Sequence, residues 1–178
     1  MPLPLDESDP IGSRRYQLTV VASSLVDLVG SAGGWMCDRA RAGWDVKVVL
    51  TEHHDTRPLA ILGASALDVD AELSDVVKMA SHGGALAIGA CVLAADERIR
   101  AGVLGILKRG LTQVTVWGQA WPNELSHKVD PVEHKLSAAA RAFKAHALGA
   151  ATVSKDSIAG TETLFNLGPD ALRALYSV

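Results

Sequence analysis

Short apolar runs alternate with polar, glycine-containing turns along most of the chain. Residues 16–22 (YQLTVVA) and 45–51 (DVKVVLT) are rich in branched apolar side chains, which is typical of buried strands. Between them, residues 33–42 place apolar and charged side chains on opposite faces and stop before Gly43, a pattern that predicts a helix. A helix between two strands favours a right-handed parallel crossover.

The same pattern continues toward the middle of the chain. Pro58 suits the first turn of a helix, and residues 71–81 predict another short one. Residues 96–109 begin with acids and end with bases, as the helix dipole favours, and residues 112–117 (TQVTVW) predict a strand. The apolar run 85–95 is ambiguous between a strand and a buried helix, because its length and period fit both.

In the last third, the spacing of apolar residues predicts one long helix that begins at Pro131 and ends at Gly149, with Lys144 on its solvated face. The tail from Thr152 carries short apolar patches that we expect to pack on the domain. The predicted fold class is α/β: a single three-layer Rossmann-like domain over residues 15–178 with a mostly parallel sheet. We expect residues 1–14, which are broken by prolines, to form a flexible arm.

Composition narrows the function classes. The formal net charge of −3 provides no basic field that would attract nucleic acid or anionic lipid. The N-terminus lacks the features of a secretory signal, and the longest apolar run is about half the length that a bilayer span needs. The two cysteines, Cys37 and Cys91, form no metal-binding or redox spacing. We therefore expect a soluble cytoplasmic protein with reduced thiols, bound neither to nucleic acid nor to a membrane.

The segment after the first strand, SSLVDLVGSAGGW, is the first candidate site, because open α/β sheets bind ligands where parallel strands end. Its glycines Gly30, Gly33 and Gly34 miss the spacing of the dinucleotide-binding motif. Two interpretations of Gly33 and Gly34 stay open. Their backbone amides could meet a phosphate at a helix start, or the glycines could permit close packing of a helix.

Other candidate ligand contacts follow the later strands. His53 and His54 come after the second strand, where a solvated polar loop is the simpler interpretation. Trp117 and Trp121 flank a turn and could form a wall for a ligand or plug the core, and His127 lies in the same loop. The candidate ligand-binding residues are Ser24, Asp27, Gly33, Gly34, His53, His54, Trp117, Trp121 and His127.

A family resemblance rests on Gly33 and Gly34, Gly43, the strand 46–50 and Thr51, which stand at matching intervals. Weaker matches are Arg57 with Leu62 and Gly63, the stretch from Val116 to Trp121, and the late run from Glu162 to Phe165. In these features the chain resembles the LmbE/PIG-L family of zinc-dependent N-deacetylases, which act on amino-sugar conjugates. The resemblance covers the N-terminal third and the rest in outline.

The resemblance also implies losses. Ser24 stands where the family has a zinc-binding histidine, Val26 where it has the aspartate that acts as general base, and Asp27 where it has a zinc-binding aspartate. A valine accepts no proton, and one carboxylate with a hydroxyl is a poor zinc site. We therefore expect no cofactor and no bound metal, with Asp27 the one matching ligand.

The leading hypothesis is a degenerate LmbE/PIG-L-like domain, a pseudoenzyme that binds a protein partner or a small sugar-like or nucleotide-like ligand. One alternative is a zinc-dependent hydrolase or N-deacetylase of an amino-sugar conjugate, with Asp27 joined by His53, His54 or His127 as relocated ligands. Another is a structural protein that forms homo-oligomers through exposed tryptophans.

Overall fold

The computed structural model describes residues 15–52, 55–68, 73–80, 84–110, 112–119, 121, 129, 131–153 and 158–168. Its strands are β1 Gln17–Ala22, β2 Asp45–Leu50, β3 Ser65–Ala66, β4 Ala85–Gly89, β5 Gln113–Trp117, β6 Pro131–Lys135 and β7 Thr161–Leu167. Its helices are α1 Leu25–Arg41, α2 Arg57–Ile61, α3 Leu73–Ala80, α4 Ala90–Ala95, α5 Glu97–Arg109 and α6 Ala138–Ala150.

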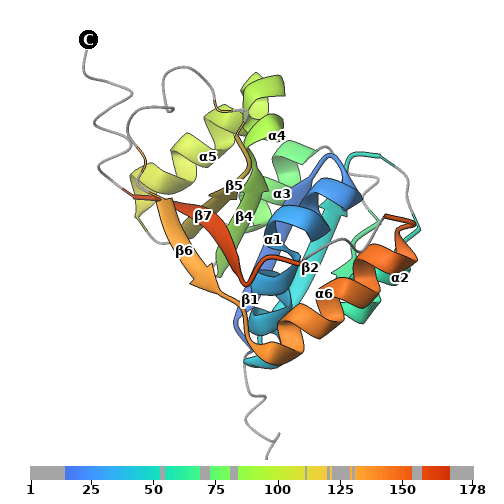
Figure 1. Ribbon diagram of the computed structural model, residues 1–178. Coiled ribbons are helices and arrows are strands. Elements are labelled where there is room, and N and C mark those ends of the chain that lie inside the picture. Colours follow the sequence, from blue (N-terminus) through green and yellow to red (C-terminus); the bar gives the residue numbers. More distant parts are fainter. Residues whose placement is uncertain are drawn as a thin grey trace, which may run out of the picture.

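One twisted sheet forms the middle of the molecule, with strand order β3-β2-β1-β4-β5-β7-β6 (Figure 1). The first five of these strands run parallel, and β7 is antiparallel to both of its neighbours, β5 and β6. Helices α1, α2 and α6 pack on one face, and α3, α4 and α5 pack on the other. The predicted three-layer, mostly parallel α/β fold is confirmed.

Strand β1 supplies both halves of the core. Its side chains alternate between the faces, so Leu18, Val20 and Ala22 pack with α1, whereas Val21 packs with α5 and its neighbours. All four side chains are at most 1% exposed. Burial on both faces explains why parallel strands appear in the sequence as continuous apolar runs.

Helix α1 begins eight residues earlier than the predicted start at residue 33. Ser24 caps it, because its Oγ accepts a hydrogen bond of 3.3 Å from the backbone N–H of Asp27. Gly33 and Gly34 therefore lie inside the helix rather than at its start. A Cβ on Gly34 would come 2.6 Å from Cδ1 of Leu136, so this glycine serves close packing, one of the two interpretations left open.

The prediction of one long helix from Pro131 is wrong for its first turns. Residues Pro131–Lys135 form β6, the edge strand that pairs with β7, and α6 begins after Ser137. The hydroxyl of Ser137 accepts from the backbone N–H of Ala140 at 3.0 Å and so caps the helix. Val132 therefore belongs to the edge strand, and only the apolar residues from 139 onward lie in a helix.

The ambiguous run 85–95 contains both elements, β4 followed directly by α4. The next helix, α5, matches its prediction: Asp96 caps the start, and Gly110 closes the end in a left-handed conformation with φ of 66°. The strands predicted at 16–22, 45–51 and 112–117 are confirmed as β1, β2 and β5.

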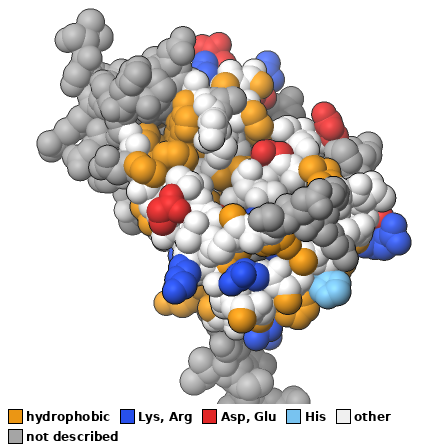
Figure 2. All heavy atoms as spheres, viewed as in Figure 1, with side chains coloured by type: hydrophobic (Ala, Val, Ile, Leu, Met, Phe, Trp, Pro, Cys, Tyr) orange, Lys and Arg blue, Asp and Glu red, His pale blue; other side chains and the backbone are white. Residues whose placement is uncertain are grey.

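Surface charge is dispersed on the face shown in Figure 2, where acidic and basic side chains stand singly among apolar ones. Within the described residues, no helix has the length and apolar character to cross a bilayer.

Candidate functional site

The carboxyl ends of β1, β4 and β5 meet at one edge of the sheet. After β1 the chain enters α1 on one face, whereas after β4 it enters α4 and α5 on the other face. Such a switch point leaves a crevice between the two connections, where open α/β sheets bind ligands. Here a pocket of about 150 Å³ is lined by Ser23, Asp27, Cys91, Trp117, Gly118 and Gln119, which we call the Asp27 pocket.

Asp27 is the charged group of this pocket. Its Oδ2 accepts a hydrogen bond of 3.1 Å from the indole Nε1 of Trp117, and its Oδ1 accepts one of 3.3 Å from the Ser31 hydroxyl. The residue lies in the first turn of α1, where the helix dipole stabilises a negative charge. Asp27 is thus an oriented, solvent-accessible carboxylate, suited to an ammonium group or to a hydrogen-bond donor on a ligand.

Two weakly polar side chains, Ser23 and Cys91, also line the Asp27 pocket. The hydroxyl of Ser23, after β1, lies 3.2 Å from Sγ of Cys91, at the start of α4. Val26, which precedes Asp27 in α1, is 43% exposed and carries no titratable group. The described lining of this pocket therefore offers one carboxylate, Asp27, together with a hydroxyl and a thiol.

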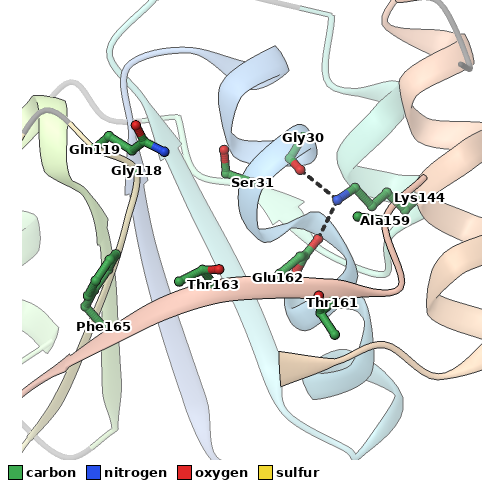
Figure 3. Close-up of a pocket in the computed structure, with 10 residues that line it drawn as sticks. All are labelled: Gly30, Ser31, Gly118, Gln119, Lys144, Ala159, Thr161, Glu162, Thr163 and Phe165. Atoms are coloured by element: carbon green, nitrogen blue, oxygen red, sulfur yellow. Dashed lines mark hydrogen bonds and ion pairs between the residues drawn. The ribbon is translucent and has the colours of Figure 1, made fainter. Parts of the chain in front are cut away.

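A second, larger pocket of about 290 Å³ shares Gly118 and Gln119 with the Asp27 pocket (Figure 3). On one side of it lies a buried ion pair, with Nζ of Lys144 2.7 Å from Oε1 of Glu162. We call this cavity the Lys144 pocket.

Glu162 ties β7 to the middle of α1. Its two carboxylate oxygens accept from the backbone N–H groups of Gly34 at 2.8 Å and Trp35 at 2.7 Å. Lys144 donates a further hydrogen bond of 2.6 Å to the carbonyl oxygen of Gly30. Both side chains of the pair are buried, with Lys144 3% and Glu162 4% exposed. The ion pair therefore joins three elements, α1, α6 and β7, at one point.

The predicted site residues are only partly brought together. Trp117 is fully buried and donates its indole N–H to Asp27. It therefore packs in the core and also orients the Asp27 carboxylate. Trp121 packs edge-on against Phe165, with ring centroids 4.8 Å apart. Ser24 caps α1, and Gly33 and Gly34 are buried inside that helix. The remaining three, His53, His54 and His127, lie outside the described residues.

Sequence reasoning missed Lys144. The spacing of α6 indicated a solvated lysine, yet the side chain is buried on Glu162. No local signal marks it, because its partner comes from β7, 18 residues later. Glu162 was found only as part of the family resemblance.

The described residues do not fit a zinc centre. No three histidine, cysteine, aspartate or glutamate side chains among them lie close enough together to hold a metal ion. Asp27 and Cys91 line one pocket, but a tetrahedral zinc site needs at least three protein ligands.

No family model and no curated protein sequence matches the chain. Solved structures do. A deacetylase from the teicoplanin biosynthesis pathway, in complex with teicoplanin, superposes with a TM-score of 0.58 at 12% identity, over 84% of this chain and 97% of that one. The zinc-inhibited form of teicoplanin deacetylase Orf2 gives a TM-score of 0.55 at 11% identity over the same shares, 84% and 97%. The A40926 pseudoaglycone deacetylase Dbv21 gives 0.50 at 15% identity, over 85% and 96%.

These comparisons establish the fold: the chain has the fold of the solved deacetylases, which is the fold that the sequence resemblance implied. They also correct one expectation. The expectation that the protein has no cofactor is wrong for this fold, because a deacetylase with the same fold is known in a zinc-inhibited form. The expectation rested on residues 24–27 alone, whereas a metal site at the edge of a sheet can draw ligands from several loops.

Proposed function

We propose that this protein binds an amino-sugar conjugate at the carboxyl edge of its sheet, with the Asp27 carboxylate as the polar anchor. The observation that carries the proposal is the fixed orientation of this carboxylate, held by Trp117 and Ser31 on the wall of a pocket. A carboxylate so placed suits the amine or amide N–H of such a ligand. The fold supports ligand binding as well, because a structurally similar deacetylase is known in complex with teicoplanin.

Calorimetric titration with a glucosamine glycoside tests the proposal. We expect binding by the full chain and at least about a tenfold loss in the Asp27→Asn variant, because the amide keeps the shape of the side chain but removes its charge. Asp75→Asn is the matched control. Asp75 is an exposed acid on α3 whose carboxylate forms an ion pair of 3.3 Å with Lys78. Equal affinity in the two variants would refute the role of Asp27.

Deacetylation of the bound conjugate is the second candidate. The similar solved structures are deacetylases, which favours hydrolysis over a role in binding alone. Its zinc ligands would have to include residues outside the described part of the chain, and His53, His54 and His127 are the candidates from the sequence.

An assay of acetate release separates the two functions. The full chain is incubated with an N-acetylglucosamine glycoside and supplied zinc, beside Asp27→Asn and the three single histidine-to-alanine variants. Release that depends on Asp27 and on at least one histidine establishes the hydrolase. Binding without release establishes a binding protein that keeps the deacetylase fold.

A further inference from the structure

We propose that an exposed arginine–aromatic surface, at the end of the molecule where β1 and β2 begin, is the docking site for the acidic run DESD of the chain's own N-terminal segment, residues 6–9. Residues 1–14 lie outside the described part of the chain. The surface lies at the opposite edge of the sheet from the Asp27 pocket, so the inference does not depend on the proposed function. We call it the Arg39 patch, which consists of Tyr16, Arg39 and Trp44.

The Arg39 patch is a continuous stack of side chains. Strands β1 and β2 begin side by side, and the last turn of α1 ends next to them (Figure 1). The rings of Tyr16 and Trp44, which directly precede the two strands, have centroids 5.3 Å apart. Cζ of Arg39 lies 5.0 Å from the centre of the Trp44 ring and 5.5 Å from that of Trp35. Tyr16 is 71% exposed, so the stack is open to solvent.

This end of the molecule carries uncompensated positive charge. Within the described part of the chain, no ion pair with an acid is formed by its three arginines, Arg15, Arg39 and Arg41. The acids beside them already have partners. Asp45 pairs with Lys47 at 3.3 Å, and Asp38 accepts hydrogen bonds from Ser137. An excess of positive charge on one surface favours an acidic partner.

The way in which Arg39 is held suits a carboxylate. A guanidinium that stacks on an aromatic ring uses its face, and the N–H groups along its edge stay available for a bidentate pair with a carboxylate. The indole rings of Trp35 and Trp44 also fix the side chain in advance, which lowers the entropy lost on binding. The run at residues 6–9 offers three carboxylates for this purpose.

The N-terminal segment has the reach and the composition to dock here. Asp9 is six residues before Arg15, and six residues span at most about 20 Å, whereas Tyr16 is itself part of the patch. Leu5 and Ile11 flank the acidic run and offer apolar contacts to the exposed rings. Because the segment is covalently attached, its effective concentration at the patch is on the order of millimolar, which makes weak contacts sufficient.

The contacts are exposed, so they are electrostatic and weak. Ion pairs at a surface contribute little to the stability of a fold and are screened by salt. We therefore expect docking to be lost at high salt, with almost no change in the thermal melting of the protein.

Fluorine NMR of the full chain labelled with 5-fluorotryptophan tests the docking. The Trp44 resonance is assigned by its loss in Trp44→Phe. We expect this resonance to shift when the acidic run is neutralised, because Trp44 is distant in sequence from the substitutions and senses them only through a contact. The shift should vanish in about 0.5 M NaCl, where charges are screened within a few ångströms. The variant carries Asp6→Asn, Glu7→Gln and Asp9→Asn.

A matched control removes the same charges elsewhere and should leave the Trp44 resonance in place. It carries three substitutions of exposed acids, Asp68→Asn, Asp75→Asn and Glu97→Gln. A second measurement follows trypsin cleavage of the full chain after Arg14 and Arg15. Arg39→Gln should accelerate this cleavage about threefold by releasing the segment, whereas Arg109→Gln, at an exposed arginine of α5, should not.

Three results would overturn the docking. They are a Trp44 resonance that is the same in the parent and in the neutralised variant, an equal shift in the control variant, and a cleavage rate that Arg39→Gln leaves unchanged. A Trp44 resonance that moved with protein concentration would assign the Arg39 patch to a second copy of the chain instead. None of these results bears on sugar binding at Asp27, so the two proposals fail separately.

Discussion

At the scale of single residues, Asp27 shows how the site is held in place. Its carboxylate accepts from Trp117 on β5 and from Ser31 one turn later in α1, and its own backbone N–H donates to the cap Ser24. The side chain is therefore fixed from the sheet and from the helix, which is the preorganisation that ligand recognition requires.

The glycines of α1 respond differently to substitution. Gly34→Ala should lower the free energy of unfolding by about 1–3 kcal/mol, because the new Cβ would come 2.6 Å from Leu136 Cδ1 in a packed core. Gly30→Ala should raise it by about 0.5–1 kcal/mol, because alanine favours the helix and its Cβ meets nothing within 4 Å. Urea denaturation measures both. Stabilisation by Gly34→Ala would contradict the packing argument.

Asp38 gives the molecule a sensitivity to acid. Burial raises the pKa of its carboxyl, but hydrogen bonds from Ser137 and His134 lower it by more, so the pKa lies below its ordinary value of 3.8. The carboxylate therefore stabilises the fold fully above that ordinary value, and its contribution is lost as the pH falls through the lowered pKa.

Denaturation at about pH 6 and about pH 2 checks this contribution. The Asp38→Asn variant should be less stable than the parent at the higher pH and lose less stability on acidification. The control Asp75→Asn, at an exposed ion pair, should keep the parent's pH dependence. An unchanged pH dependence in Asp38→Asn would show that this carboxyl titrates alike in the folded and unfolded chains.

At the scale of elements, α1 is held by a buried charge of another element. Glu162 of β7 accepts from two backbone amides in the middle of α1 and from Lys144 of α6. An ion pair in the interior stabilises little overall, but removing one partner leaves the other unpaired and desolvated.

A double-mutant cycle tests this coupling. Glu162→Gln should cost about 3–5 kcal/mol of unfolding free energy, because the ammonium of Lys144 stays buried without its counter-charge. Lys144→Met should also destabilise, and the double variant should lose less than the sum of the single losses, by more than about 1 kcal/mol. Urea denaturation measures each corner, and strictly additive losses would refute the coupling.

The sequence predicted those elements whose signals are local. Runs of branched residues marked β1, β2 and β5, and capping residues marked α5. The first two turns of α1 were missed because they contain Gly30, a poor helix former, and burial of the helix outweighs its low propensity. Strand β6 was missed because its pairing with β7 joins residues about thirty positions apart.

The candidate site was predictable only in part, because local sequence signals mark its location but not the long-range contacts that form it. Its location followed from the ends of the parallel strands, and Asp27 from the family resemblance. The partner of that carboxylate, Trp117, is 90 residues away, and the Lys144–Glu162 pair joins two elements that no periodicity relates. Side chains that meet across the fold leave no local pattern in the sequence.

At the scale of the whole molecule, the parallel half and the antiparallel extension are one unit. Leu136, which follows β6, and Ala140 and Ala147 of α6 belong to the same buried cluster as α1 and one face of β1. The pairs Asp38–Ser137 and Gly34–Glu162 join the two halves by hydrogen bonds. The parallel half therefore depends on the extension to cover α1.

A shortened chain tests this dependence. A chain that ends at residue 130 lacks β6, α6 and β7, so the edge of β5 and the outer face of α1 would lie open to water. We expect no cooperative thermal transition by circular dichroism, because an uncovered apolar face and an unpaired strand favour aggregation over folding. A chain that begins at residue 15 is the control and should melt like the parent, as the predicted N-terminal arm implies. A cooperative transition in the chain that ends at residue 130 would show that the parallel strands form a folding unit of their own, and the Lys144–Glu162 pair would then stabilise only the extension.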